Sequence, residues 1–117
     1  MRYFKLDANR CPVACSELDW ISNMHDKEND IASDMRADYL IRTCFVGLSQ
    51  QVGYGDPLLF QTDVYRHVFA LIGIRNIKKF VSTHSYITWE QASYGHARIV
   101  AEIDAKITQA RSDVQRP

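Results

Sequence analysis

The chain has little that would connect it with a disulfide scaffold, a membrane or nucleic acid in general. Only 3 of its 117 residues are cysteine, an odd number that favours free thiols in a reducing compartment. No apolar run approaches the roughly 18–20 residues that cross a bilayer, and the start, Met-Arg-Tyr-Phe-Lys-Leu-Asp, has no hydrophobic stretch of a signal peptide. The 14 basic and 14 acidic residues balance, whereas general nucleic-acid binders carry a basic excess. We therefore expect a protein of the cytoplasm that binds neither membranes nor general nucleic acid.

Catalytic and metal-binding motifs are also missing. The sequence has no Ser-His-Asp order, no HExxH motif and no paired-carboxylate motif. The loop Gly53-Tyr54-Gly55-Asp56 lacks the glycine spacing and the lysine of a P-loop. Cys11 and Cys15 are spaced more widely than the cysteine pairs of most structural zinc sites, and a fourth ligand beside His25 is not evident. We expect no metal and no cofactor, and a protein without enzymatic activity rather than an enzyme.

The residues that are present suit one soluble domain over 1–117, with fraying from residue 112 onward. Apolar residues make up 46 % of the chain and charged residues 24 %, which is ordinary for a globular protein. Alternating or β-branched segments predict strands at 2–7, 31–37, 40–48, 58–65 and 79–87. The strand at 40–48 is apolar on both faces, which is typical of a central strand, and it should form an antiparallel hairpin with 58–65.

Two segments show helical patterns. Ser16 is a candidate N-cap for a short amphipathic helix over 17–25, whose apolar face should hold Leu18, Ile21 and Met24 with Trp20 at its edge. Thr88 and Gln91 form a Thr-x-x-Gln capping box that begins a longer helix. The apolar stripe of that longer helix consists of Ala92, His96, Ile99, Ile103 and Ile107, with Val100 beside it.

Residues 9–14 are predicted to form a loop, and 66–78 fit either an extension of the preceding strand or a short helix. These elements together predict an α+β fold: an antiparallel sheet of three to five strands, with the C-terminal amphipathic helix packed on one face and the short N-terminal helix beside it or at an edge. The sequence does not decide which face of the sheet the helix covers.

Three blocks of the chain are similar, in order and spacing, to a family of small uncharacterised proteins found mainly in bacteriophage genomes. The blocks follow Trp20 and read Ile41-Arg42-Thr43-Cys44-Phe45-Val46-Gly47-Leu48, then Pro57-Leu58-Leu59-Phe60-Gln61-Thr62-Asp63-Val64-Tyr65, then Tyr86-Ile87-Thr88-Trp89-Glu90-Gln91-Ala92-Ser93-Tyr94-Gly95-His96. Gln61 stands where the family usually has glutamate, and the stretch between Tyr65 and Tyr86 is longer and more apolar than in the family. The resemblance implies a phage-type accessory protein of the host cytoplasm and names no reaction.

The candidate site residues are His96, Gln61, Asp63, Thr43 and Tyr65. His96 lies on the apolar stripe after Gly95, whose missing side chain should let the helix approach the sheet closely. We favour a packing role for His96, in which it hydrogen-bonds a strand carbonyl or the Thr62 hydroxyl, over a role as general base or polar anchor. Gln61 and Asp63 share a strand face. If the helix covers the other face, they should be exposed together with Thr43; if it covers theirs, Gln61 should pair with His96.

The sequence is compatible with two functions. The first is non-catalytic binding to a host protein, as in counter-defence or host takeover, anchored by exposed aromatics such as Tyr39, Tyr54, Tyr65 and Tyr94. The alternative is a small enzyme or small-molecule binder with a pocket between His96 and the strand at 60–65. A homodimer joined through an edge strand is compatible with either function.

Overall fold

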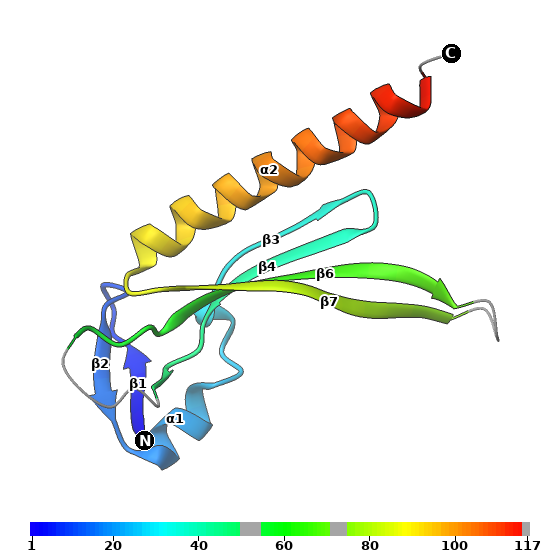
Figure 1. The fold of residues 1–117 in the computed structure, drawn as a ribbon. Coiled ribbons are helices and arrows are strands. Elements are labelled where there is room, and N and C mark those ends of the chain that lie inside the picture. Colours follow the sequence, from blue (N-terminus) through cyan, green and yellow to red (C-terminus); the bar gives the residue numbers. More distant parts are fainter. Residues whose placement is uncertain (50–54, 71–74, 116–117) are drawn as a thin grey trace.

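The structure, a computed structural model, describes residues 1–49, 55–70 and 75–115. Within these residues the chain forms an α+β fold with two antiparallel sheets, a short N-terminal helix and a long C-terminal helix (Figure 1). The predicted fold class is therefore confirmed. The loop with Gly53 and Tyr54 and the turn at Gly73 lie outside the described residues.

The larger sheet has four strands in the order β3-β4-β6-β7. Their bounds are β3 Asp30–Arg36, β4 Tyr39–Phe45, β6 Phe60–Ala70 and β7 Arg75–Tyr86. The antiparallel pairing of β4 with β6 and the central place of β4 were both predicted. The described residues of the 66–78 segment extend the two strands: β6 continues through Ala70, and β7 begins at Arg75.

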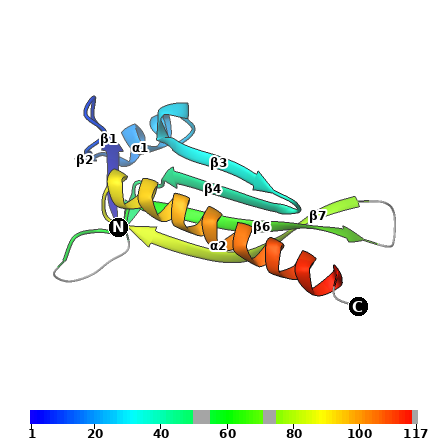
Figure 2. The same cartoon turned by 90° about the horizontal axis from the view of Figure 1, so that it is seen from above.

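Helix α2, Trp89–Gln115, lies across one face of this sheet (Figures 1 and 2). Its start follows the predicted cap: the Gln91 N–H donates to Thr88 Oγ1 at 3.1 Å. The Gln91 side chain returns to the N–H of Ile87, one residue before the cap, at 3.2 Å. The helix runs on through Ser112, where fraying was predicted, so that its last turns reach beyond the β3–β4 turn (Figure 2).

The core lies between α2 and the sheet. The helix contributes Ile99 and Ile103, which pack with Ile41 of β4 and Val64 of β6. A second group, nearer the start of α2, brings together residues of the helix, both sheets and the 55–59 segment: Phe4, Phe45, Leu59, Phe60 and Ala92. In β6, Phe60, Thr62 and Val64 are buried and alternate with Gln61, Asp63 and Tyr65, so α2 covers the Thr62 face and leaves the Gln61 face open.

The smaller sheet was not anticipated. It has the order β2-β1-β5, with bounds Pro12–Cys15, Arg2–Leu6 and Leu48–Ser49. The prediction that 9–14 is entirely loop is wrong, because Pro12 stands at the first position of β2, where a missing N–H costs no ladder bond. The single strand predicted over 40–48 is also divided: β4 ends at Phe45, and the chain turns at Gly47, whose φ is +71°, into the other sheet.

Helix α1, Glu17–Asn23, is present and capped by Ser16, but it faces the other way from the prediction. Trp20 points toward the small sheet, where its ring lies 5.7 Å from that of Tyr3 and its indole N–H donates to Val46 O at 3.0 Å. The residues predicted to be buried are exposed: Leu18, Ile21 and Met24. A half-buried indole with a hydrogen-bond partner buries more apolar area than any of these aliphatic side chains, which explains why α1 turns Trp20 toward the sheet. The 3-10 turn η1, Lys27–Asn29, follows within the charged run.

Gly95 brings α2 close to the end of β7. A Cβ atom at this position would overlap the ring of Tyr86. The sequence predicted that the missing side chain allows close contact between helix and sheet, and the structure confirms it.

Replacing Gly95 with alanine should therefore destabilise the protein even though alanine is the better helix former by about 1 kcal/mol. Overlap with a packed ring typically costs about 1–3 kcal/mol, so we expect a net loss of up to about 2 kcal/mol. Urea unfolding monitored by circular dichroism measures it, with Ser93→Ala, an exposed position on the same helix, as the control. Adding Tyr86→Leu to Gly95→Ala should restore part of the loss; a Gly95→Ala variant more stable than the parent would contradict the close contact.

Candidate functional site

A polar chain crosses the interface between α2 and the sheet. His96 Nε2 lies 2.7 Å from Asp34 Oδ2 on β3, and His96 Nδ1 lies 2.7 Å from Thr43 Oγ1 on β4. Thr43 Oγ1 in turn lies 2.5 Å from Thr62 Oγ1 on β6. This series of side-chain hydrogen bonds thus joins four elements: α2, β3, β4 and β6. This agrees with the predicted packing role of His96. The hydroxyl that His96 contacts is, however, that of Thr43, and Thr62 is connected to His96 only through Thr43.

Proton positions along this chain follow from the carboxylate. An ionised carboxylate only accepts hydrogen bonds, so Nε2 of His96 carries a hydrogen and donates it to Asp34. Nδ1 then accepts from the Thr43 hydroxyl when the ring is neutral, or donates to the Thr43 oxygen when the ring is protonated. The two threonine hydroxyls can reverse their direction to suit either state.

The Asp34 carboxylate, the His96 imidazole and the Thr43 hydroxyl are connected in the order found in hydrolase triads, but the hydroxyl is not accessible to a substrate. Thr43 is 1 % exposed and His96 is 4 % exposed. Both ring nitrogens of His96 are engaged, so neither is free for a substrate proton. The geometry therefore suits a fixed polar contact within the core better than catalysis.

The hydrogen bond from His96 holds the pKa of Asp34 below its usual range, and the nearby Arg36 contributes in the same direction. Arg36 lies 3.5 Å from Asp34 and 3.2 Å from Asp104 on α2. Because the pKa of Asp34 is lowered in the folded state, this contact stabilises the fold above about pH 4 and its contribution falls as the carboxylate is protonated below that pH.

The other predicted site residues lie on the open face of the sheet. Asp63 Oδ1 accepts hydrogen bonds from Gln61 Nε2 at 2.7 Å and from Thr83 Oγ1 at 2.8 Å. Tyr65 lies on the same face of β6. The expectation that Thr43 shares this face is wrong: Thr43 is paired with Thr62 in the ladder, and cross-strand partners point to the same side, here toward the helix.

An apolar row runs straight across this open face. Successive register partners are Met35 on β3, Leu40 on β4, Tyr65 on β6 and Phe80 on β7. At a strand spacing of about 4.8 Å the row spans about 14 Å. Met35 is 57 % exposed and Phe80 is 55 % exposed, while the rings of Tyr65 and Phe80 pack edge to face with centroids 6.0 Å apart. The neighbouring row is polar and includes Arg42 and Asp63.

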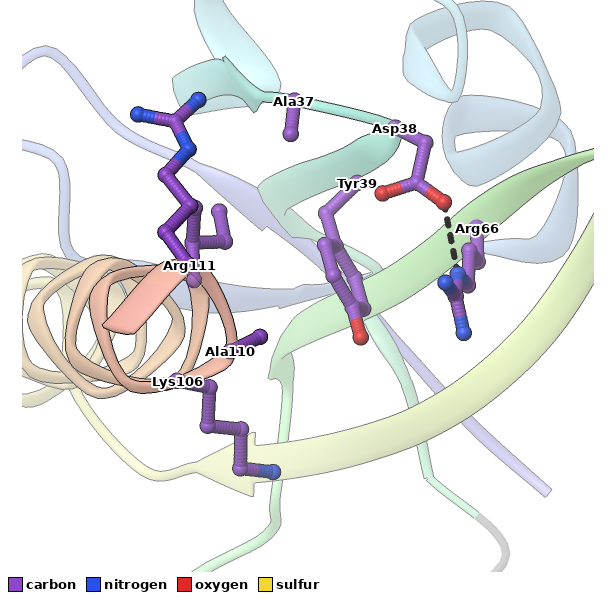
Figure 3. Close-up of a pocket in the computed structure, with 8 residues that line it drawn as sticks. Ala37, Asp38, Tyr39, Arg66, Lys106, Ala110 and Arg111 are labelled. Carbon is purple, nitrogen blue, oxygen red and sulfur yellow. Dashed lines mark hydrogen bonds and ion pairs between the residues drawn. The ribbon is translucent and has the colours of Figure 1, made fainter. Parts of the chain in front are cut away.

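A cavity lies on the helix side, beyond the end of the core, and none of the predicted site residues line it. It has a volume of about 400 Å³ and opens between the last turns of α2 and the turn that joins β3 to β4. Figure 3 shows the Tyr39 ring at its centre, with Arg66 on the strand side and Lys106 and Arg111 on the helix side. Ile107 and Ala110 supply apolar wall from the helix.

The charges around this cavity are unequal. Arg66 Nε donates to Asp38 Oδ2 at 2.6 Å, and this contact holds the pKa of Asp38 below its usual range. The Arg66 guanidinium also lies 5.4 Å from the centre of the Tyr39 ring. Among the described residues no carboxylate forms an ion pair with Lys106 or Arg111. The cavity wall thus carries two cations that no carboxylate balances.

Sequence reasoning named Tyr65 and Tyr39 as candidate contact residues but missed the two groups in which the structure places them. Leu40, Tyr65 and Phe80 were recognisable as strand residues, but their alignment depends on register, and in β7 on the irregularity opposite Val64 and Tyr65. The cavity residues come from three elements: Tyr39 from β4, Arg66 from β6 and Lys106 from α2. Their contact depends on the angle at which α2 crosses the sheet, and a single sequence does not predict that angle. Asp34 was missed for the same reason.

The cysteines are free thiols in the structure, as the odd number suggested. Burial raises the pKa of the Cys44 thiol above its usual range, which makes that sulfur a poor nucleophile near neutral pH. In the three described stretches, no cluster of histidine, cysteine or carboxylate side chains has the geometry to hold a metal ion. No helix within the described residues is long and apolar enough to cross a membrane.

Comparisons of the chain with protein-family models, with curated proteins and with solved structures found no match.

Proposed function

We propose that the chain is a phage-type accessory protein that acts in the host cytoplasm by binding a host protein, without chemistry of its own. The observation that carries the proposal is the apolar row of Met35, Leu40, Tyr65 and Phe80 on the open face of the sheet. The phage origin and the host partner are what the three sequence blocks around Trp20, Phe60 and Trp89 imply by their resemblance.

The open face has the composition of a protein interface. Aromatic and methionine side chains are enriched in the centres of such interfaces, and charged residues gather at their rims. Here Tyr65 and Phe80 form a packed aromatic pair, and Arg42 and Asp63 stand in the next row. A soluble domain gains nothing in its own stability from exposing Met35 and Phe80, whereas a partner could bury both.

The alternative of an enzyme or small-molecule binder with a pocket at His96 receives less support from the geometry. Thr62 is fully buried on the strand at 60–65, and His96 fills the space against it through Thr43. A ligand would have to displace packed side chains to reach the imidazole.

Photo-cross-linking from single positions tests the proposal. A photoreactive phenylalanine analogue replaces Phe80 on the open face, Leu18 on α1 or Tyr94 on the outer side of α2, all of which are exposed. In a bacterial lysate we expect one host protein to cross-link from position 80 and not from position 94. Unlabelled parent protein should compete with it, while Phe80→Lys should compete about thirtyfold less well, since central aromatic residues commonly contribute about 2 kcal/mol to binding.

Two results would contradict the proposal. Cross-links from Leu18 alone would place binding on α1, whose exposed Ile21 and Met24 offer a rival apolar surface. A cross-linked product that contains only this chain would identify the partner as a second copy.

A further inference from the structure

We propose that the cavity beside Tyr39 is a binding site for a small amphipathic anion: a carboxylate, sulfonate or phosphate monoester on an apolar body. The site lies on the covered side of the sheet, opposite the apolar row, and is independent of the proposed protein-binding face. The anion would lie between Lys106 and Arg111, and its apolar body against Tyr39, Ile107 and Ala110.

The choice of an anion follows from the charges. Three cationic side chains border the cavity, and the one carboxylate among them, Asp38, is already bonded to Arg66. Lys106 and Arg111 have no such partner among the described residues. An anionic group in the cavity would be attracted by both of these cations. A neutral or cationic ligand would gain nothing from these two groups.

The choice of an apolar body follows from the wall between the charges. Tyr39 presents its ring, which Arg66 holds in place from the far side by a cation–π contact at 5.4 Å. Ile107 continues the apolar stripe of α2 past the edge of the packed core and is only half-buried. A cavity of about 400 Å³ falls in the range of roughly 300–1,000 Å³ that is usual for small-molecule sites. Inorganic phosphate or acetate would leave most of this wall uncovered.

Octanoate, octanol and acetate are a matched set of probes for the proposal. Octanoate has both the anion and the apolar body, octanol has only the body, and acetate has only the anion. The intact protein is titrated with each probe, and binding is measured by calorimetry and by backbone amide shifts. Octanoate should bind at least tenfold more tightly than octanol or acetate. The shifts should concentrate at Tyr39 and Ala110 and leave Phe80 unchanged, which separates this cavity from the open sheet face.

The double variant Lys106→Gln/Arg111→Gln tests the role of the charges. Both side chains are exposed, so the fold should be retained, and octanoate should bind about tenfold more weakly. Arg98→Gln removes a cation of the same helix outside the cavity, where Arg98 lies 3.8 Å from Glu102, and should bind octanoate as the parent does.

Four outcomes would overturn the proposal. Equal affinity for octanoate and octanol would show that the cations do not select the ligand. Unchanged affinity in the double variant, or amide shifts centred on Phe80, would place the anion elsewhere. Co-sedimentation with phosphatidylglycerol vesicles without any binding of free octanoate would identify a membrane surface as the source of the anion.

Discussion

Replacing Ile99 with aspartate should unfold the protein. Ile99 is 3 % exposed and packs against Ile41 and Val64 at the centre of the interface between α2 and the sheet. The variant loses the burial of an aliphatic side chain, which alone costs about 2–5 kcal/mol, and it places a carboxylate among apolar groups without a partner. The sum reaches the whole stability of about 5–15 kcal/mol that a domain of this size commonly has.

Thermal unfolding followed by circular dichroism, together with amide spectra, measures this effect. Ala101→Asp introduces the same carboxylate two residues further along the helix, at an exposed position, and should melt within a few degrees of the parent. Ile99→Val keeps the apolar character and should cost only about 0.5–1.5 kcal/mol. If Ile99→Asp melts cooperatively with a native spectrum, α2 does not pack on the sheet through this stripe.

Replacing His96 with leucine should cost about 1–3 kcal/mol, although leucine has a similar size and is more apolar. The imidazole now satisfies the buried Thr43 hydroxyl and the Asp34 carboxylate at once. Without it, the pair of threonine hydroxyls loses one hydrogen-bond partner in a place that water does not reach. Denaturant unfolding at pH 6 measures the loss.

The same variant should change the pH dependence of stability. His96 is the main cause of the lowered pKa of Asp34 in the folded protein. A lowered pKa means that the ionised carboxylate stabilises the fold, fully above about pH 4 and progressively less below it. The gap in stability between the parent and His96→Leu should therefore be larger above about pH 5 than near pH 3.

A compensated variant separates the hydrogen bonds from simple packing. Changing Thr43 and Thr62 to valine along with His96→Leu removes both hydroxyls and leaves an apolar interface of similar shape, so most of the stability should return. A His96→Leu variant as stable as the parent, with the same pH profile, would show that the polar chain contributes nothing.

Local patterns were enough to predict the main elements. The cap at Thr88 and the stripe of Ile99, Ile103 and Ile107 indicated α2 because both signals repeat within one helix and depend on nothing distant. Alternation in 58–65 separated Thr62 from Gln61 correctly, since side chains in a strand must point to opposite faces. The close contact at Gly95 could be predicted because glycine inside a helix is unfavourable unless its lack of a side chain is used.

The predictions that were wrong concern features that depend on contacts between distant segments. The periodicity of α1 pointed to Leu18 and Ile21, but the hydrogen bond from Trp20 to Val46, 26 residues away, sets its orientation. Thr43 was placed on the wrong face because the apolar residues of its strand fall on both sides, so the pattern carries no direction until β6 fixes the pairing. The cavity at Tyr39 depends on where the far end of α2 lies, and no local preference specifies that position.

The polar chain through His96 also fixes how far along the sheet the helix sits. Ile99, Ile103 and Ile107 recur every four residues, and such a stripe would fit nearly as well after sliding by about 6 Å. A slide of that size would carry the imidazole away from Asp34 and Thr43, so that the buried ring and the buried Thr43 hydroxyl would lose these hydrogen bonds in a place that water does not reach. One histidine among interchangeable isoleucines thereby selects a single alignment.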